Sequence, residues 1–100
     1  VRMVPAVPFS NPNHFFHRAK AIAESAPGAF WANQFENVAN SEAHYKTTGP
    51  EIWAQTEGNV DVFVSAVGTG GTIGGVSRFL KERKPSVEVV AADPMGSGIY

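Results

Sequence analysis

The sequence predicts an α/β fold with three layers, in which helices flank a mostly parallel sheet. A run rich in Val and Phe and poor in charge spans residues 60–67, as expected for a central parallel strand covered on both faces. Residues 72–84 place apolar side chains at helical spacing, and a second apolar run spans residues 87–92. A strand, a helix and a strand in this order predict a βαβ unit with parallel strands and a right-handed crossover.

The first third of the chain predicts one helix between two short strand candidates. Residues 1–4 alternate apolar and charged side chains, and the prolines that follow would confine a strand there to a sheet edge. The Ser-Asn-Pro run at residues 10–12 is a helix-start signal, because proline lacks only an N–H that the first turn does not use. Helical spacing then predicts a helix over residues 13–26, and residues 29–32 are a candidate buried strand.

The middle of the chain predicts two short helical segments. Residues 41–45 suit one or two helical turns. A second helix is expected over residues 48–56, with Pro50 in its first turn and Glu51 placed to favour the helix dipole. Gly58 ends this segment, and Pro85 ends the later helix, whose last turn is basic.

The composition is that of a packed globular protein, with 43% hydrophobic residues, 17% charged residues and a formal net charge of -1. No basic stripe suits nucleic acid, and the longest apolar run is far shorter than the roughly 20 residues that span a membrane. The chain has no cysteine, which excludes disulfides and a thiol nucleophile within it. His14 and His17 lack a third ligand nearby, so we expect no metal site. We expect the chain to be part of a longer protein, because it starts on an apolar run without Met and ends as another begins.

A glycine-rich loop, Gly-Thr-Gly-Gly-Thr at residues 68–72, joins the strand at 60–67 to the helix at 72–84. In open α/β sheets, ligands bind where strands give way to helices. Glycines allow close backbone approach, and several amides at a helix N-terminus can then point at one anion. The pattern therefore favours a phosphate-binding loop, while a plain tight turn is the structural alternative.

Two other phosphate-binding patterns fit less well. A P-loop needs a lysine at the end of the loop, and none is present. A dinucleotide fingerprint needs G-x-G-x-x-G; Gly68 and Gly70 fit, but Ile73 takes the third position and Gly74 comes one residue late. Asp93 ends the next apolar run, where a ribose-binding acid would lie, so an oxidoreductase of this kind stays open as an alternative.

A specific combination of motifs covers residues 33–82, about half of the chain: QFENVAN, TTGPEIW and GTGGTIGGVSR. Together they resemble the cysteine synthase and cystathionine β-synthase family, which are fold-type II pyridoxal-phosphate enzymes similar to the β subunit of tryptophan synthase. Val38 stands where the family usually has proline, which bears on the stiffness of the loop rather than on its chemistry.

The resemblance implies a site and a reaction. It implies that Gly68, Thr69, Gly70, Gly71 and Thr72 hold the 5′-phosphate of pyridoxal 5′-phosphate, and that Gln34 lies at the carboxylate of a small amino-acid substrate. The implied reaction is β-replacement, in which O-acetylserine and sulfide give cysteine. By the same resemblance, residues 1–30 belong to a smaller mobile domain and residues 31–100 to a larger phosphate-binding domain. A homodimer in the cytoplasm is expected, with mitochondria as the alternative compartment.

No catalytic residue of the family falls within this chain. The lysine that forms the Schiff base lies upstream of the matched region in the family, and the chain's four lysines all suit solvated surface positions. We therefore expect the isolated chain to be inactive. A truncated relative without catalytic function is the non-enzyme alternative.

Overall fold

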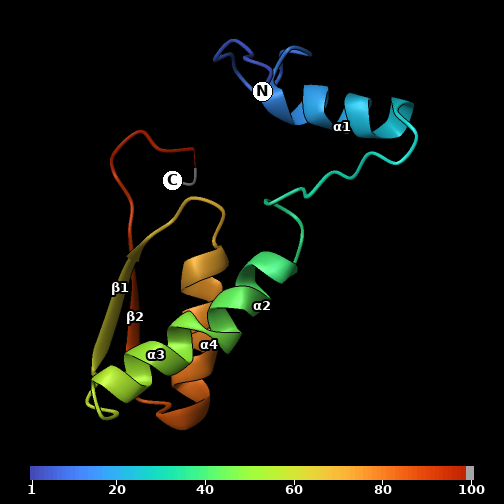
Figure 1. Cartoon of the computed structure of the whole chain (residues 1–100). Coiled ribbons are helices and arrows are strands. Elements are labelled where there is room, and N and C mark those ends of the chain that lie inside the picture. The colour runs from blue at the N-terminus through green and yellow to red at the C-terminus, as the bar shows by residue number, and fades with distance from the viewer. Residues whose placement is uncertain (99–100) are drawn as a thin grey trace. The chain divides into compact units, whose positions relative to one another are not determined.

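The computed structural model describes residues 1–98 and divides the chain into two compact units (Figure 1). The first unit comprises Val1–Asn33, and the second begins at Gln34. Among the described residues, no helix is both long and apolar enough to cross a lipid bilayer.

The first unit is built around helix α1 (Phe15–Ser25), which confirms the helix expected over residues 13–26. The N-cap is His14, whose ring Nδ1 accepts a hydrogen bond from the Phe16 amide at 3.3 Å. The Ser-Asn-Pro run lies in a turn just before the helix, where the His14 amide donates to the Asn11 carbonyl at 2.9 Å. An imidazole therefore caps the helix, in place of a residue of the Ser-Asn-Pro run.

The structure contradicts both strand candidates of this unit. Residues 1–4 and 29–32 form no strand, and the Phe30 side chain is exposed. Trp31 instead packs its ring edge-on against Phe16, with 4.9 Å between the ring centroids. One aromatic contact thus anchors a short apolar run that has no neighbouring strand among the described residues.

The second unit contains the predicted βαβ arrangement. Its elements in chain order are helix α2 (Ala39–Lys46), helix α3 (Thr48–Gln55), strand β1 (Val62–Ala66), helix α4 (Gly71–Arg83) and strand β2 (Glu88–Ala92). The two strands pair in parallel, from Val62 opposite Glu88 to Ala66 opposite Ala92 (Figure 1). The parallel sheet with flanking helices confirms the α/β class.

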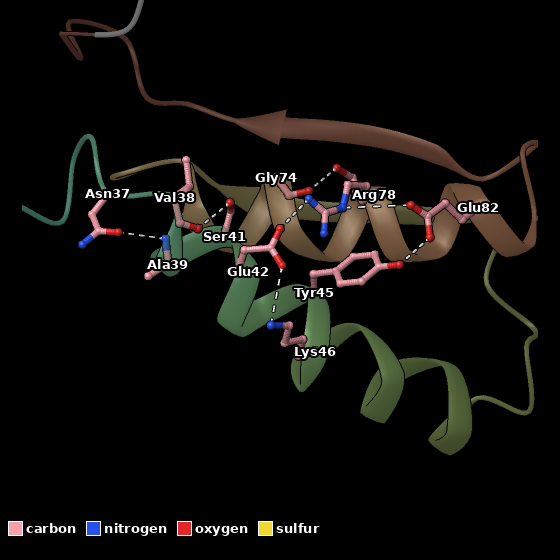
Figure 2. Close-up of polar contacts among 11 residues, drawn as sticks. Asn37, Val38, Ala39, Ser41, Glu42, Tyr45, Lys46, Gly74, Arg78 and Glu82 are labelled. Carbon is pink, nitrogen blue, oxygen red and sulfur yellow. Dashed lines mark hydrogen bonds and ion pairs between the residues drawn. The ribbon is translucent and has the colours of Figure 1, made fainter.

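Helix α2 begins earlier than the turn expected over residues 41–45. The side-chain oxygen of Asn37 accepts a hydrogen bond from the Ala39 amide at 3.0 Å, and the Ser41 hydroxyl donates to the Val38 carbonyl at 3.1 Å (Figure 2). The first bond satisfies one of the amides that a helix N-terminus leaves without partners. The second is an additional bond to the Val38 carbonyl, which also accepts the Glu42 amide at 3.0 Å.

The core of the second unit lies between the helices and one face of the sheet. Its buried side chains are Val60, Val76, Phe79, Leu80 and Val87, and Phe63 of β1 packs against them. The other face of the sheet is open within the described residues, where Val62 and Val64 are 49% and 58% exposed. The expectation that the first strand is covered on both faces is therefore not met by this chain.

Two glycines let the helices approach closely. A side chain at Gly75 of α4 would lie 2.8 Å from the Cβ of His44 in α2, and one at Gly49 of α3 would lie 2.7 Å from the Cβ of Phe79. Real side chains essentially never come so close. The glycine of TTGP and the second glycine of the Gly-Gly pair in α4 are thus packing residues of the three-helix layer.

A polar cluster of four residues, Glu42, Tyr45, Arg78 and Glu82, joins α2 to α4 at the surface (Figure 2). The Arg78 guanidinium contacts the Glu42 carboxylate at 2.8 Å and lies over the Tyr45 ring, 3.8 Å from its centroid. The Tyr45 hydroxyl donates to the Glu82 carboxylate at 2.6 Å. The hydrogen bond from Arg78 lowers the pKa of the Glu42 carboxyl below its usual value.

Candidate functional site

The glycine loop follows the carboxyl end of β1 and leads directly into α4, as the sequence predicts. Gly70 is the N-cap of α4 and has φ of 80°, a left-handed conformation that glycine adopts at little cost. Gly70 itself offers no capping side chain, and the first amide of α4, that of Gly71, donates to the Thr69 hydroxyl at 3.3 Å. The backbone hydrogen bonds within α4 begin with the one from the Gly74 amide to the Gly70 carbonyl. The amides that precede Gly74 therefore lie at the positive end of the helix dipole.

A cavity of about 310 Å³ opens beside this loop. One side is formed by residues 34–38 with Asn40 and Ser41, and the other by residues 69–71 with Gly74. The fold therefore brings Gln34 and three residues of the loop to one cavity, although Gln34 and the loop are far apart in the sequence. Gly68 and Thr72 flank the lining residues in the chain.

Asn40 joins the two sides of the cavity. Its side-chain amide donates to the Thr69 hydroxyl at 2.8 Å and to the Gln34 carbonyl at 3.1 Å. The amide also packs against Gly71, where any side chain would overlap it. Asn40 closes the QFENVAN motif, but its place in the sequence does not mark it as a site residue.

His44 supports the other threonine of the loop. Its ring Nε2 lies 3.2 Å from the Thr72 hydroxyl, and its Nδ1 lies 2.9 Å from the Thr48 hydroxyl. The imidazole therefore links α3, α2 and the first turn of α4. Sequence separation hides this link, because Thr72 lies 28 residues after His44.

The lysines and Asp93, which are candidate site residues from the sequence, lie outside the lining of the cavity. Lys84 pairs with Asp61 at 2.7 Å, Lys46 lies 4.0 Å from Glu42, and Lys20 lies 3.9 Å from Glu24. Lys81 reaches the Pro85 carbonyl at the end of α4, so none of the four lysines lines the cavity. Asp93 follows β2 and accepts a hydrogen bond from the Ser97 hydroxyl. No cluster of three metal-ligating side chains occurs in the described part of the chain.

The loop fits a phosphate group. Apart from the adjacent residues in the chain, no heavy atom lies within 4 Å of the place where a side chain would begin at Gly68 or Gly70, so the backbone there is open to a ligand. Amides at the first turn of α4 and two threonine hydroxyls supply uncharged donors, as in other phosphate sites at helix N-termini. The fold and the loop are those expected of a phosphate-binding protein of the α/β class.

Comparison with known proteins gives the family. Residues 6–100 match the family described as pyridoxal-phosphate dependent enzymes, and the chain belongs to this family. Cysteine synthase 2 of Schizosaccharomyces pombe is 50% identical over all of this chain and 27% of its own length. Cysteine synthase 1 of Neurospora crassa is 53% identical over 97% of this chain and 26% of its own length. The chain therefore spans about a quarter of these relatives.

Solved structures agree with this assignment. An O-acetylserine-dependent cystathionine β-synthase from Helicobacter pylori matches with a TM-score of 0.79 and 40% identity, covering 82% of this chain and 27% of that one. A cysteine synthase from Entamoeba histolytica matches with a TM-score of 0.76 and 43% identity, covering 88% of this chain and 26% of that one. The likeness confirms the predicted family and fold class, and it does not support the dinucleotide-binding alternative.

Proposed function

We propose that the protein carrying this chain is a pyridoxal-phosphate-dependent cysteine synthase, which replaces the acetoxy group of O-acetylserine with sulfide. The observation that carries the proposal is the glycine loop, which faces the segment of Gln34 across one cavity. Relatives at about 50% identity over the whole chain are named cysteine synthases, which supports the reaction class.

The residues of this chain have binding and orienting roles in the proposal. The backbone of Gly68, Gly70 and Gly71 and the hydroxyls of Thr69 and Thr72 hold the cofactor's phosphate at the positive end of α4. Gln34, on the opposite side of the cavity, binds the carboxylate of the amino-acid substrate. When bound, the cofactor supplies the electron sink for the reaction, while the protein anchors and orients it.

The arrangement of the whole protein is also part of the proposal. Residues 1–30 belong to the smaller domain and residues 31–100 to the larger one, which the division of the chain after Asn33 supports. We propose a homodimer in the cytoplasm, with mitochondria as the alternative because a Saccharomyces cerevisiae relative that is 50% identical carries a mitochondrial name.

The chain by itself is proposed to be inactive. All four lysines lie away from the cavity, and a lysine that bonds to the cofactor must be buried and deprotonated to react. The hundred residues mixed with the cofactor, O-acetylserine and sulfide should therefore form no cysteine. Cysteine formation by the chain alone would contradict this part of the proposal.

The reaction is tested with the whole protein that carries this chain. Cysteine formation from O-acetylserine and sulfide is measured with the cofactor bound and after its removal, and homocysteine is offered as a second acceptor. We expect cofactor-dependent cysteine formation, and a Gln34→Ala variant that raises KM for the amino acid more than it lowers kcat. A protein that forms neither cysteine nor cystathionine, or that works equally well without the cofactor, would overturn the proposal.

A further inference from the structure

The side-chain amide of Asn40 is oriented by its partners. One of them, the Gln34 carbonyl at 3.1 Å, can only accept hydrogen bonds, so the group that faces it is the NH2. The same NH2 lies 2.8 Å from the Thr69 hydroxyl and donates its second proton there. Asn40 is therefore a double donor that binds both sides of the cavity at once.

The Thr69 hydroxyl receives two hydrogen bonds. The first comes from Asn40, and the second comes from the Gly71 amide at 3.3 Å. A hydroxyl has one proton and two acceptor positions. Because both acceptor positions are used, the proton of Thr69 is left to be donated to another group.

We propose that Asn40 is a positioning residue that makes Thr69 an obligatory hydrogen-bond donor to the cofactor's phosphate. This inference rests on the proposed function and deepens it, since it identifies what makes the Thr69 hydroxyl a donor rather than an acceptor toward the phosphate. Gly71 contributes to the same arrangement, because the Asn40 amide occupies the space that a Cβ at Gly71 would fill. The bond to the Gln34 carbonyl ties the substrate-binding segment to the same amide.

The test compares two ligands that differ only in the phosphate. Dissociation constants for pyridoxal phosphate and for pyridoxal, which lacks the phosphate, are measured on the whole protein carrying this chain. Asn40→Ala removes the double donor and should weaken binding of pyridoxal phosphate about tenfold, the effect of one hydrogen bond to a charged group. Asn40→Asp replaces the donor with an acceptor that captures the Thr69 proton, and should weaken it about a hundredfold. Binding of pyridoxal should change less than twofold in both variants.

A double-mutant cycle tests whether Asn40 acts through Thr69. Thr69→Val removes the hydroxyl and should itself weaken pyridoxal phosphate binding, after which Asn40→Ala should cause no further loss. Thr69→Ser keeps the hydroxyl and should retain the wild-type affinity. Asn59→Ala is the matched control, because Asn59 lies in the loop before β1, outside the cavity lining, and should leave both dissociation constants unchanged.

The outcomes separate the inference from the proposed function. Equal losses of pyridoxal and pyridoxal phosphate, or independent effects of Asn40 and Thr69, would overturn the positioning role and leave the proposed reaction intact. A wild-type protein that does not bind pyridoxal phosphate would overturn both. A melting temperature measured for each variant without ligand shows whether Asn40→Ala is folded. The isosteric Asn40→Asp gives the same comparison should the alanine variant fail to fold.

Discussion

Two neighbouring glycines of α4 are expected to respond to alanine in opposite directions. At Gly74 the nearest atom to an added Cβ would be the Ser41 Cβ at 3.9 Å, an ordinary contact. Gly74→Ala should therefore stabilise the protein by about 0.5–1 kcal/mol, because alanine is the better helix former. At Gly75 the added Cβ would lie 2.8 Å from both the His44 Cβ and the Tyr45 amide nitrogen, and closer still to the Ser41 carbonyl oxygen.

The cost at Gly75 exceeds the gain in helix propensity. Overpacking in a tight interior costs about 1–3 kcal/mol, and the upper end applies here because backbone atoms of α2 stand opposite and cannot rotate away. After the gain of about 1 kcal/mol from propensity, Gly75→Ala should lower the free energy of unfolding by about 2 kcal/mol. The two variants should thus differ by roughly 3 kcal/mol.

Urea unfolding of the two variants beside the wild-type protein, all without cofactor, measures this difference. The same displacement of α2 would shift His44, so Gly75→Ala should also bind pyridoxal phosphate more weakly. A Gly75→Ala protein that is as stable as Gly74→Ala would refute the close approach of α2 and α4.

Three further predictions concern the polar cluster of Glu42 and Arg78, the His44 imidazole, and Gly70 of the glycine loop. Because Arg78 lowers the pKa of Glu42 in the folded protein, this carboxylate contributes stability above its ordinary pKa of 4.5, and the contribution is lost as the pH falls through the lowered value. The difference in melting temperature between wild type and Glu42→Gln should therefore be present at neutral pH and shrink well below pH 4.5. An equal difference in melting temperature at the two pH values would contradict this prediction. His44→Phe removes the bond to Thr72 and should raise the dissociation constant for pyridoxal phosphate about threefold to tenfold, as measured by equilibrium dialysis, whereas an unchanged constant would show that Thr72 needs no support. Gly70→Ala places a side chain at φ of 80° and should cost about 1–2 kcal/mol in urea unfolding, while Gly70→Asn should cost less; equal costs would indicate that strain is not the cause.

The βαβ unit could be predicted because its signals are local. The apolar runs, the helical spacing of α4 and the basic last turn all lie within single elements, and a parallel pair joined by a helix follows from their order. The glycine loop could be placed for the same reason, since ligands collect at the carboxyl ends of parallel strands. Local patterns thus predicted the position of the glycine loop without any knowledge of the helices beside it.

The supporting contacts could not be predicted in this way. Asn40 and Thr69 lie 29 residues apart, and their hydrogen bond exists only because α2 packs against the start of α4. The roles of Gly71 and Gly75 depend on the same packing, which a single sequence does not reveal. The strand expected over residues 29–32 was predicted wrongly, because an apolar run alone does not provide a partner strand.

The open face of the sheet has a consequence for handling the chain. Val62 and Val64 of β1 lie beside Val90 of β2 on that face, and all three are about half exposed. A two-stranded sheet is marginal in water, and an apolar face bordered by unpaired strand edges promotes self-association. Produced on its own, the chain should bind hydrophobic dyes and precipitate as its concentration rises. Self-association of the sheet, rather than unfolding of the helices, should therefore limit work on the isolated chain.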